Sequence, residues 1–305
     1  MKPFVFDMET GDPDDFLTLA LLAGHPEVDL RGVTITPGTP HQVGLVRWFL
    51  DHVDLGHLPV GAFDIDHMSR RSGQYEKCVS AWHYRTFGEI SPSHDAETGS
   101  AVLESVGPNV DLVTGAALKN LGRFYRLNDT SWPGPLTIQG GFAGDNVVPP
   151  ELRLEKFDGR LTCPTFNLNG DVASARLVFE RAGAHPTRMV SKNVCHGVIY
   201  DQHMHDELRA MAEASGGPHL GMQWVFRGME SYLSRRPEGK KFHDPLAAMC
   251  ALRPEIGTWV RGMPYRVEGG HWSGEWGFEP DPEGPVEIII DYDRELFLET
   301  MLGIG

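Results

Sequence analysis

The sequence predicts an α/β protein in which an open, mostly parallel sheet is flanked by helices. Short apolar runs alternate along the chain with segments of helical periodicity. This alternation favours a parallel sheet, because two parallel neighbours need a long crossover connection, which a helix usually supplies. No internal repeat or low-complexity linker interrupts the pattern, and 305 residues with 41% hydrophobic composition can bury a large core. We therefore expect a single domain over residues 1–305.

The first elements show both patterns most clearly. Residues 3–7 are an apolar run that ends in an acid, and residues 14–24 have helical periodicity until a glycine and a proline stop it. The same patterns predict strands over 30–36, 110–115, 135–141, 187–192 and 286–293, and helices over 40–53, 116–127 and 294–302. Residues 64–100 and 142–166 fit neither pattern. We expect long loops there, and such loops in a compact domain are often functional.

Charge and cysteine content exclude several classes of protein. The formal net charge is -15, so binding to a phosphate backbone would oppose the overall field, and we expect no nucleic-acid partner. The four cysteines show no paired CxxC spacing, which favours reduced, buried thiols over a zinc knot or a disulfide framework. The sequence also shows neither a basic and apolar leader nor an apolar run long enough for a membrane span. These features predict a cytoplasmic protein without a membrane partner.

An acid-rich loop follows the first predicted strand. The stretch FDMETGDPDD contains five acids and no lysine or arginine: Asp7, Glu9, Asp12, Asp14 and Asp15. One interpretation is helix capping, for which one or two acids suffice. Five neighbouring carboxylates repel one another and raise each other's pKa values unless a cation holds them ionised. Because all the donors are hard oxygens, we favour a site for Ca2+ or Mg2+ over capping.

A second acidic position lies far along the chain. Residues 240–252 predict a helix with Asp244 at the cap and Pro245 at the first helical position, so a structural role for the acid is sufficient. His243 has no such structural role. An imidazole beside a carboxylate in a polar loop can deliver a proton near neutral pH. Asp244 and His243 are therefore candidate site residues.

Five motifs in order along the chain resemble the inosine-uridine preferring nucleoside hydrolases. The family opens with D-x-D-x-x-x-D-D after the first strand, where this chain has DMETGDPDD. The later counterparts are VTGAALKNL (113–121), IQGGFAGDN (138–146), TFNLNGDVASARLVF (165–179) and FHDPLAA (242–248). The resemblance implies a Rossmann-like core and a hydrolase that cleaves the N-glycosidic bond of a ribonucleoside or related N-riboside.

The resemblance also implies a metal and a set of roles. A single Ca2+ would be bound by Glu9, Asp15, Asp244 and the main-chain carbonyl of Thr114. Glu9 would act as general base on a water molecule that the ion activates.

Substrate contacts follow from the same resemblance. Asp14 would contact the ribose 2'-hydroxyl, and Asn146 and Asn167 would hold further sugar hydroxyls. His243 would protonate the departing base.

Several residues depart from the family pattern. Glu9 replaces an aspartate, and the loop has one extra residue. Thr39 and Thr165 stand where the family has an asparagine and a glutamate that contact the nucleoside. Lys156 and Arg160 bring cations into the segment before Thr165, which suggests a substrate modified or charged at the 5' position.

Two other functions remain open. One is a catalytically altered nucleoside-binding or sugar-binding protein on the same scaffold. The other is a Mg2+-dependent phosphatase that uses Asp7 as its nucleophile. Exposed aromatic side chains would permit a homo-oligomer.

Two histidine-containing pairs are interpreted as structural. His203 and His205 are expected on the solvated face of a helix, although an H-x-H pair can bind a metal. Cys195 and His196 are expected in a strand-to-helix turn without a catalytic role.

Overall fold

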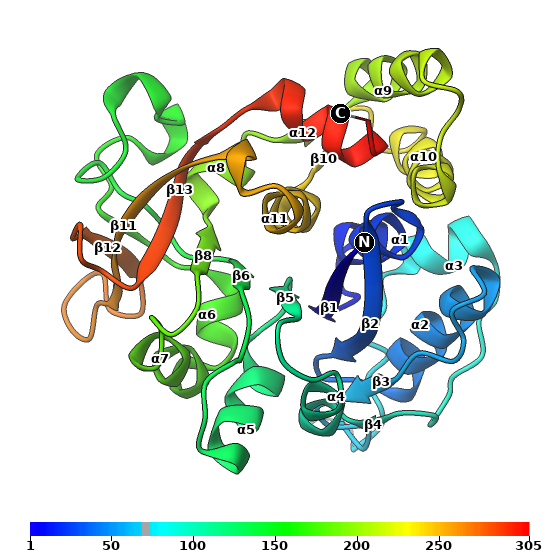
Figure 1. Cartoon of the computed structure of the whole chain (residues 1–305), viewed down its shortest axis with the longest axis horizontal. Helices are drawn as coiled ribbons and strands as arrows, with labels where there is room; N and C mark the ends of the chain where they lie inside the picture. Colours follow the sequence, from blue (N-terminus) through cyan, green and yellow to red (C-terminus); the bar gives the residue numbers. More distant parts are fainter. Residues whose placement is uncertain (69–72, 305) are drawn as a thin grey trace.

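The computed structural model describes residues 1–68 and 73–304 and is built around one large sheet (Figure 1). The described chain contributes eleven strands to it. Their spatial order is β4 (Glu97–Thr98), β3 (Val60–Ala62), β2 (Val28–Ile35), β1 (Lys2–Met8), β5 (Asp111–Thr114), β6 (Leu136–Gln139), β8 (Thr187–Val190), β13 (Val286–Tyr292), β11 (Gly257–Arg266), β12 (Trp276–Pro280) and β7 (Thr162–Cys163). Every pair from β4 to β13 is parallel, which confirms the predicted sheet.

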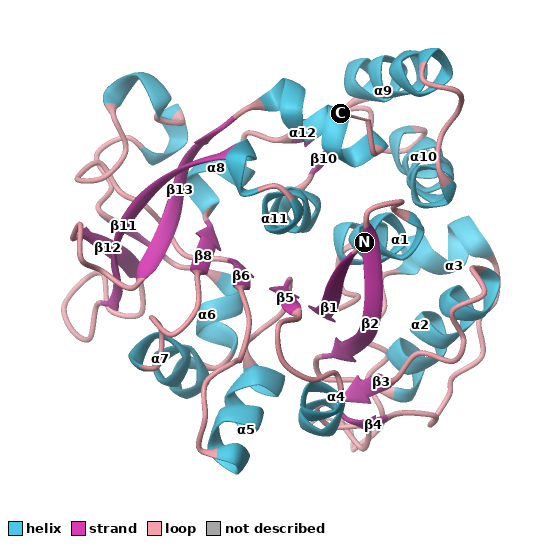
Figure 2. Cartoon of the chain, viewed as in Figure 1, coloured by secondary structure: helices cyan, strands magenta, loops and turns pink. Residues whose placement is uncertain are grey.

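Helices cover both faces of this sheet (Figure 2). The longer ones are α1 (Pro13–Gly24), α2 (Pro40–His52), α5 (Lys119–Asn128), α7 (Val172–Glu180), α9 (Gln202–Ala214), α10 (Leu220–Leu233), α11 (His243–Leu252) and α12 (Arg294–Leu302). Along β1, Phe4 and Phe6 pack into one hydrophobic core with α1, α2 and α11, while Val5 packs into the other with α5 and α7. This alternation follows from the two-residue period of a strand.

The sheet continues past β13 with an antiparallel extension that the sequence analysis did not predict. β11 pairs with β13 and β12, and β12 pairs with β7. β11 is mostly half-buried or exposed, so it lacks the apolar run that marks the parallel strands.

The two expected loops contain more regular structure than predicted. Residues 64–100 include α3 (Ala81–Phe87), β4 and the first residues of α4 (Gly99–Ser105). The segment 142–166 contains two short 3-10 helices, η1 (Pro150–Leu152) and η2 (Glu155–Phe157), and ends in β7 and the first residue of α6 (Phe166–Gly170).

The placement of Asp244 as a helix cap is wrong. β10 (Lys240–Lys241) pairs with β9 (Ile199–Tyr200), and α11 begins immediately afterwards at His243, with Phe242 at the cap position. Asp244 therefore lies inside the first turn. Its carboxylate is left available for tertiary contacts.

The prediction of a solvated face holds for only one of the paired histidines in α9. His203 is exposed, whereas His205 is buried and hydrogen-bonded to the Tyr200 hydroxyl and the Arg209 guanidinium. The inward face of the helix packs on β9 and α10, which covers His205 but not His203. Among the described residues, no helix is long and apolar enough to span a membrane.

Candidate active site

The acid-rich loop lies at the carboxyl end of the central strand. β1 is flanked on both sides by parallel neighbours, β2 and β5, and α1 begins at Pro13. Asp14 and Asp15 occupy the first turn of α1 and are each only 2% exposed. Asp12 is the cap residue, but its side chain makes no capping hydrogen bond within the described chain. The capping interpretation thus does not account for these acids.

A pocket opens at this edge of the sheet. It has a volume of about 400 Å³, within the usual range for small-molecule sites. Its lining residues come from the loop after β1, from α1, β6, α6 and α11, and from the turn after β5: Glu9, Gly11, Asp12, Asp14, Asp15, Gly115, Gln139, Phe166, Asn167, His243 and Asp244. Ligand pockets are expected at the carboxyl ends of parallel strands.

Three buried carboxylates form the centre of the pocket, and we call them the acid trio: Asp14, Asp15 and Asp244. Each offers a ligand oxygen, and these oxygens lie within 4.8 Å of one another. The Oδ1 atom of Asp244 is buried and has no hydrogen-bond partner among the described residues. Burial, followed by the neighbouring negative charges, raises the pKa of Asp15 and of Asp244 well above the usual range.

Gly115 keeps the space beside the acid trio open. A Cβ atom at this position would lie 2.7 Å from Asp244 Oδ1 and 3.1 Å from Asp15 Oδ1. A side chain there would displace one of the carboxylates. The all-oxygen donor set, the unpartnered Asp244 oxygen and the bare glycine together fit a hard divalent cation.

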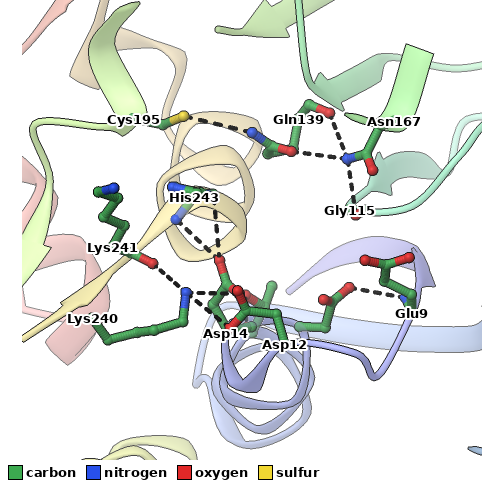
Figure 3. A network of polar contacts seen from close by, with 12 residues as sticks. Glu9, Asp12, Asp14, Gly115, Gln139, Asn167, Cys195, Lys240, Lys241 and His243 are labelled. Atoms are coloured by element: carbon green, nitrogen blue, oxygen red, sulfur yellow. Dashed lines mark hydrogen bonds and ion pairs between the residues drawn. The ribbon is translucent and has the colours of Figure 1, made fainter. Parts of the chain in front are cut away.

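A lysine that the sequence analysis missed contacts the acids. The ammonium of Lys240 lies 3.0 Å from Asp12 Oδ1 and 3.1 Å from Asp14 Oδ1, and its side chain is buried (Figure 3). Burial alone would lower the pKa of Lys240. The negative charges of Asp14 and Asp12 outweigh this effect, so the pKa of Lys240 is raised above its usual value. Only its proximity in sequence to Asp244 could have suggested this contact. Lys240 partly neutralises Asp14 and leaves Asp15 and Asp244 without such a partner.

His243 lies between the acids and a second histidine. Its main-chain N–H donates to Asp14 Oδ2 at 3.2 Å, and its ring stacks on His196 with centroids 5.0 Å apart. The buried Nε2 atom of His243 has no partner in the described part of the chain. Burial and the nearby lysines, with Lys240 the strongest, lower the pKa of His243 to about 3. The imidazole is therefore neutral near pH 7 in this structure, with Nε2 free for a ligand.

Two further predicted residues line the pocket. Glu9 lies at its edge, outside the acid trio, and its main-chain N–H donates to Asp15 Oδ1 at 2.9 Å. Burial, then the charges of Asp14 and Asp12, raise the pKa of Glu9 to about 7. The Asn167 amide donates to the main-chain oxygens of Gly115 and Gln139, each at 3.0 Å. Asn167 thereby ties the two glycine-containing turns together.

Other predicted residues lie outside the pocket lining. Thr39 caps α2, where its hydroxyl accepts from the N–H of Gln42 and donates to the Lys77 oxygen at 2.9 Å. Asn146 is exposed and donates to the Phe278 oxygen of β12 at 2.9 Å. Both side chains are thus used in structural contacts.

The two predicted threonines nearer the site are buried. Thr114 ends β5 directly before Gly115, and Thr165 directly precedes Phe166 and α6. The hydroxyl of each lacks a hydrogen-bond partner among residues 1–68 and 73–304.

Asp7 points into the protein. It is fully buried, and its Oδ1 accepts from the Thr34 hydroxyl at 2.7 Å and the Asn120 amide at 2.9 Å. Burial raises the pKa of Asp7 to about 7, despite these two hydrogen bonds. A carboxyl group held in this way, away from the pocket lining, is unsuited to nucleophilic attack, which argues against the phosphatase alternative.

Fold and pocket define an α/β protein with buried, metal-competent carboxylates at the carboxyl ends of its parallel strands. The family model described as inosine-uridine preferring nucleoside hydrolase matches residues 4–299, and the chain belongs to this family. It is accordingly a hydrolase acting on N-glycosyl compounds.

Individual relatives are distant. An uncharacterised protein of Aquifex aeolicus (strain VF5) is 27% identical over 298 residues, which are 95% of each chain. A plant nucleoside hydrolase, PpNRh1, superposes with a TM-score of 0.69 at 17% identity and 99% coverage of both chains. A purine-preferring ribonucleoside hydrolase from Gardnerella vaginalis superposes with a TM-score of 0.66 at 19% identity, covering 99% of this chain and 97% of that one. At such identities the solved structures show the shared fold.

Proposed function

We propose that the protein is a Ca2+-dependent N-ribohydrolase that cleaves the N-glycosidic bond of a ribonucleoside or related N-riboside. One observation carries the proposal: a buried acid trio with an unpartnered oxygen shares a pocket with His243, whose Nε2 atom is also unpartnered. An acidic floor suits a positively charged sugar, and an imidazole beside it suits a leaving base.

Asp15 and Asp244 would hold the ion. They belong both to the acid trio and to the ligand set that the family resemblance implies. The third carboxylate would be Asp14 or Glu9, with the main-chain carbonyl of Thr114 as a further oxygen ligand. When bound, Ca2+ supplies a positive charge that lowers the pKa of a water molecule and makes it a better nucleophile.

Glu9 is suited to the role of general base. A carboxylate with a pKa near 7 binds a proton far more strongly than an exposed glutamate does, and it is still largely ionised slightly above neutral pH. It lines the pocket but is not part of the acid trio, which leaves its oxygens free to accept a proton.

Asp14 and Asn167 would orient the sugar. Asp14 accepts a hydrogen bond from the His243 N–H and pairs with Lys240. These two contacts hold its carboxylate in one orientation, in which it would accept a hydrogen bond from the 2'-hydroxyl. The negative charge of the acidic wall stabilises the oxocarbenium character that the sugar acquires as the bond breaks.

His243 would assist the departure of the base. The base gains negative charge as it leaves, and an N–H of the neutral imidazole at the pocket wall can donate a hydrogen bond that stabilises this charge. The neutral ring already carries one such N–H, whose position on Nδ1 or Nε2 depends on the tautomer.

The proposal is tested with a panel of ribonucleosides, in Ca2+ and in EDTA, by following release of the free base. We expect release only with Ca2+. Nucleoside binding without base release would favour the catalytically altered binding protein instead. Release of inorganic phosphate from phosphomonoesters, with no base release, would favour a phosphatase.

A further inference from the structure

Three lysines gather on the side of the pocket occupied by the stacked histidines, and we call them the lysine cluster: Lys156, Lys192 and Lys241. Lys156 Nζ lies 2.8 Å from His196 Nδ1, and Lys192 Nζ contacts the Pro164 oxygen at 2.7 Å. In Figure 3 the side chain of Lys241 extends beside His243. All three ammonium charges lower the pKa of His196, after burial and His243, which places them around one ring.

The lysine cluster is assembled from distant parts of the chain. Lys156 comes from η2, Lys192 from α8 (Lys192–Cys195) and Lys241 from β10. Their convergence depends on tertiary structure and is not a run of basic residues in the sequence. Arg160, from the same segment as Lys156, instead lies 3.8 Å from Glu275 and faces Trp272.

None of the three lysines pairs with a carboxylate in the described part of the chain. Lys2 and Lys240 do form such pairs. The chain has 42 acids and only 27 lysines and arginines, so acidic partners are plentiful. Three adjacent unpaired cations in so acidic a protein form a local positive field.

The cluster adjoins the pocket at two points. His196, which contacts Lys156, stacks on the pocket residue His243. Pro164, which contacts Lys192, is followed by Thr165 and the pocket residue Phe166. Thr165 is only 3% exposed, and its hydroxyl has no partner among the residues described. A ligand extending from the pocket toward this side would meet ammonium groups.

We propose that the substrate carries an anionic group of the phosphate or carboxylate type and that the lysine cluster binds it. This inference rests on the proposed N-ribohydrolase function. Ammonium groups bind phosphate and carboxylate oxygens as point charges. The acid trio inside the pocket repels an anion, so the anionic end of the substrate faces the lysines and the sugar faces the acids.

The anion can be part of either end of the substrate. A phosphate would be on the sugar, and a carboxylate would be on the base. Three probes separate these sources: uridine, uridine 5'-monophosphate, and uridine with a carboxyl group on its base. Titration calorimetry in EDTA measures their binding without turnover, and base release in Ca2+ is measured separately.

We expect at least one anionic probe to bind about 10-fold or more tightly than uridine, because a charge-assisted contact contributes about that much. Lys192→Met and Lys156→Met should each reduce this preference about 10-fold. Arg31→Met is the matched control. It removes one exposed positive charge from the middle of β2, outside the pocket lining, and should keep the preference. Melting curves verify that each variant is folded.

Equal affinity for all three probes, including no measurable binding of any, would overturn the lysine-cluster proposal. So would a preference that survives in both lysine variants. Tight anion binding without base release in Ca2+ would instead overturn the N-ribohydrolase and leave the anion site standing. Base release from uridine with the same kcat/KM as from both anionic probes would support the N-ribohydrolase and overturn the anion site.

Discussion

The acid trio inside the pocket and the lysine cluster beside it carry opposite charge and are built differently. The acid trio is buried and sits on the first turns of α1 and α11, against the carboxyl ends of the central strands. The lysine cluster is half-buried or exposed and sits on a 3-10 helix, a short helix and a two-residue strand. Buried charges in rigid elements suit bond cleavage, whereas exposed charges on peripheral segments suit selection of the substrate.

The largest expected effect comes from removing one member of the acid trio. Asp244→Asn should lower base release by about 10,000-fold or more, because the ion contributes several kcal/mol to the transition state. The rise in melting temperature on adding Ca2+ should also disappear, since only an ion bound to the folded state stabilises it. Asp15→Ala should behave in the same way.

Asp12→Ala is the matched control for that loss. Asp12 pairs with Lys240 and lies outside the acid trio, so its removal should have a smaller effect. Loss of ion binding in Asp12→Ala alone would show that the ligands in the loop are misassigned.

His243 stacks on His196 between the acid trio and the lysine cluster, and its assistance to the leaving base can be separated from the rest of the site. His243→Ala should slow cleavage of nucleosides with poor leaving groups by about 100- to 1,000-fold, the usual cost of removing one donor that stabilises developing negative charge. A p-nitrophenyl riboside needs no proton to leave, so its cleavage should change little. Equal losses on both substrates would indicate that His243 positions the sugar or supports Asp244.

A smaller effect should follow from filling the space between the acids. Gly115→Ala places a methyl group 2.7 Å from Asp244 Oδ1, and we expect Ca2+ affinity to fall about 10-fold as the carboxylate shifts. Gly11→Ala is the control, because Gly11 lines the same pocket with open space around its Cβ position. Isothermal titration with Ca2+ compares the two. Similar affinities in both variants would contradict the close fit at Gly115.

The smallest expected effect is on stability as a function of pH. The folded-state pKa values of Asp7 and Glu9 are raised to about 7, so between pH 4 and 7 these two groups hold more protons in the folded protein than in the unfolded chain. Their contribution to the stability of the apo protein should therefore be largest below about pH 4 and be lost as the pH rises to about 7. Ca2+ should reduce this loss, because it favours the ionised form of Glu9. Glu9→Gln, which cannot ionise, should remove part of this loss, and an unchanged pH dependence of the melting temperature in EDTA would contradict the assignment.

The longer strands of the parallel half were predictable from sequence because they are largely buried and appear as continuous apolar runs. β3 and β4 were missed, because they are only three and two residues long. β11 escaped prediction since much of its surface is exposed and its residues do not alternate cleanly. Helix boundaries near the site were also inaccurate: α11 begins one residue before Asp244, not after it.

Part of the candidate site was also predictable from sequence, and part was not. Asp14, Asp15, Asn167, His243 and Asp244 line one pocket, as their motifs predicted. Lys240 and the lysine cluster could not be found in this way, because local patterns contain no information on which distant segments meet. Thr39 and Asn146 occupy positions that contact the substrate in the family pattern. In this chain their side chains instead donate hydrogen bonds to the main-chain oxygens of Lys77 and Phe278.

One consequence of this architecture concerns the synthesis of the protein. Asp14 contacts the His243 N–H across 229 residues of sequence, so the two halves of the acidic wall emerge from the ribosome at very different times. The central strand and its carboxylates are made first, yet they cannot form the ion site until α11 follows. A nascent chain that lacks α11 carries mutually repelling acids without their partners. An ion bound by the acid trio would thus be captured late in the assembly of the chain, when most of the sheet has already been synthesised.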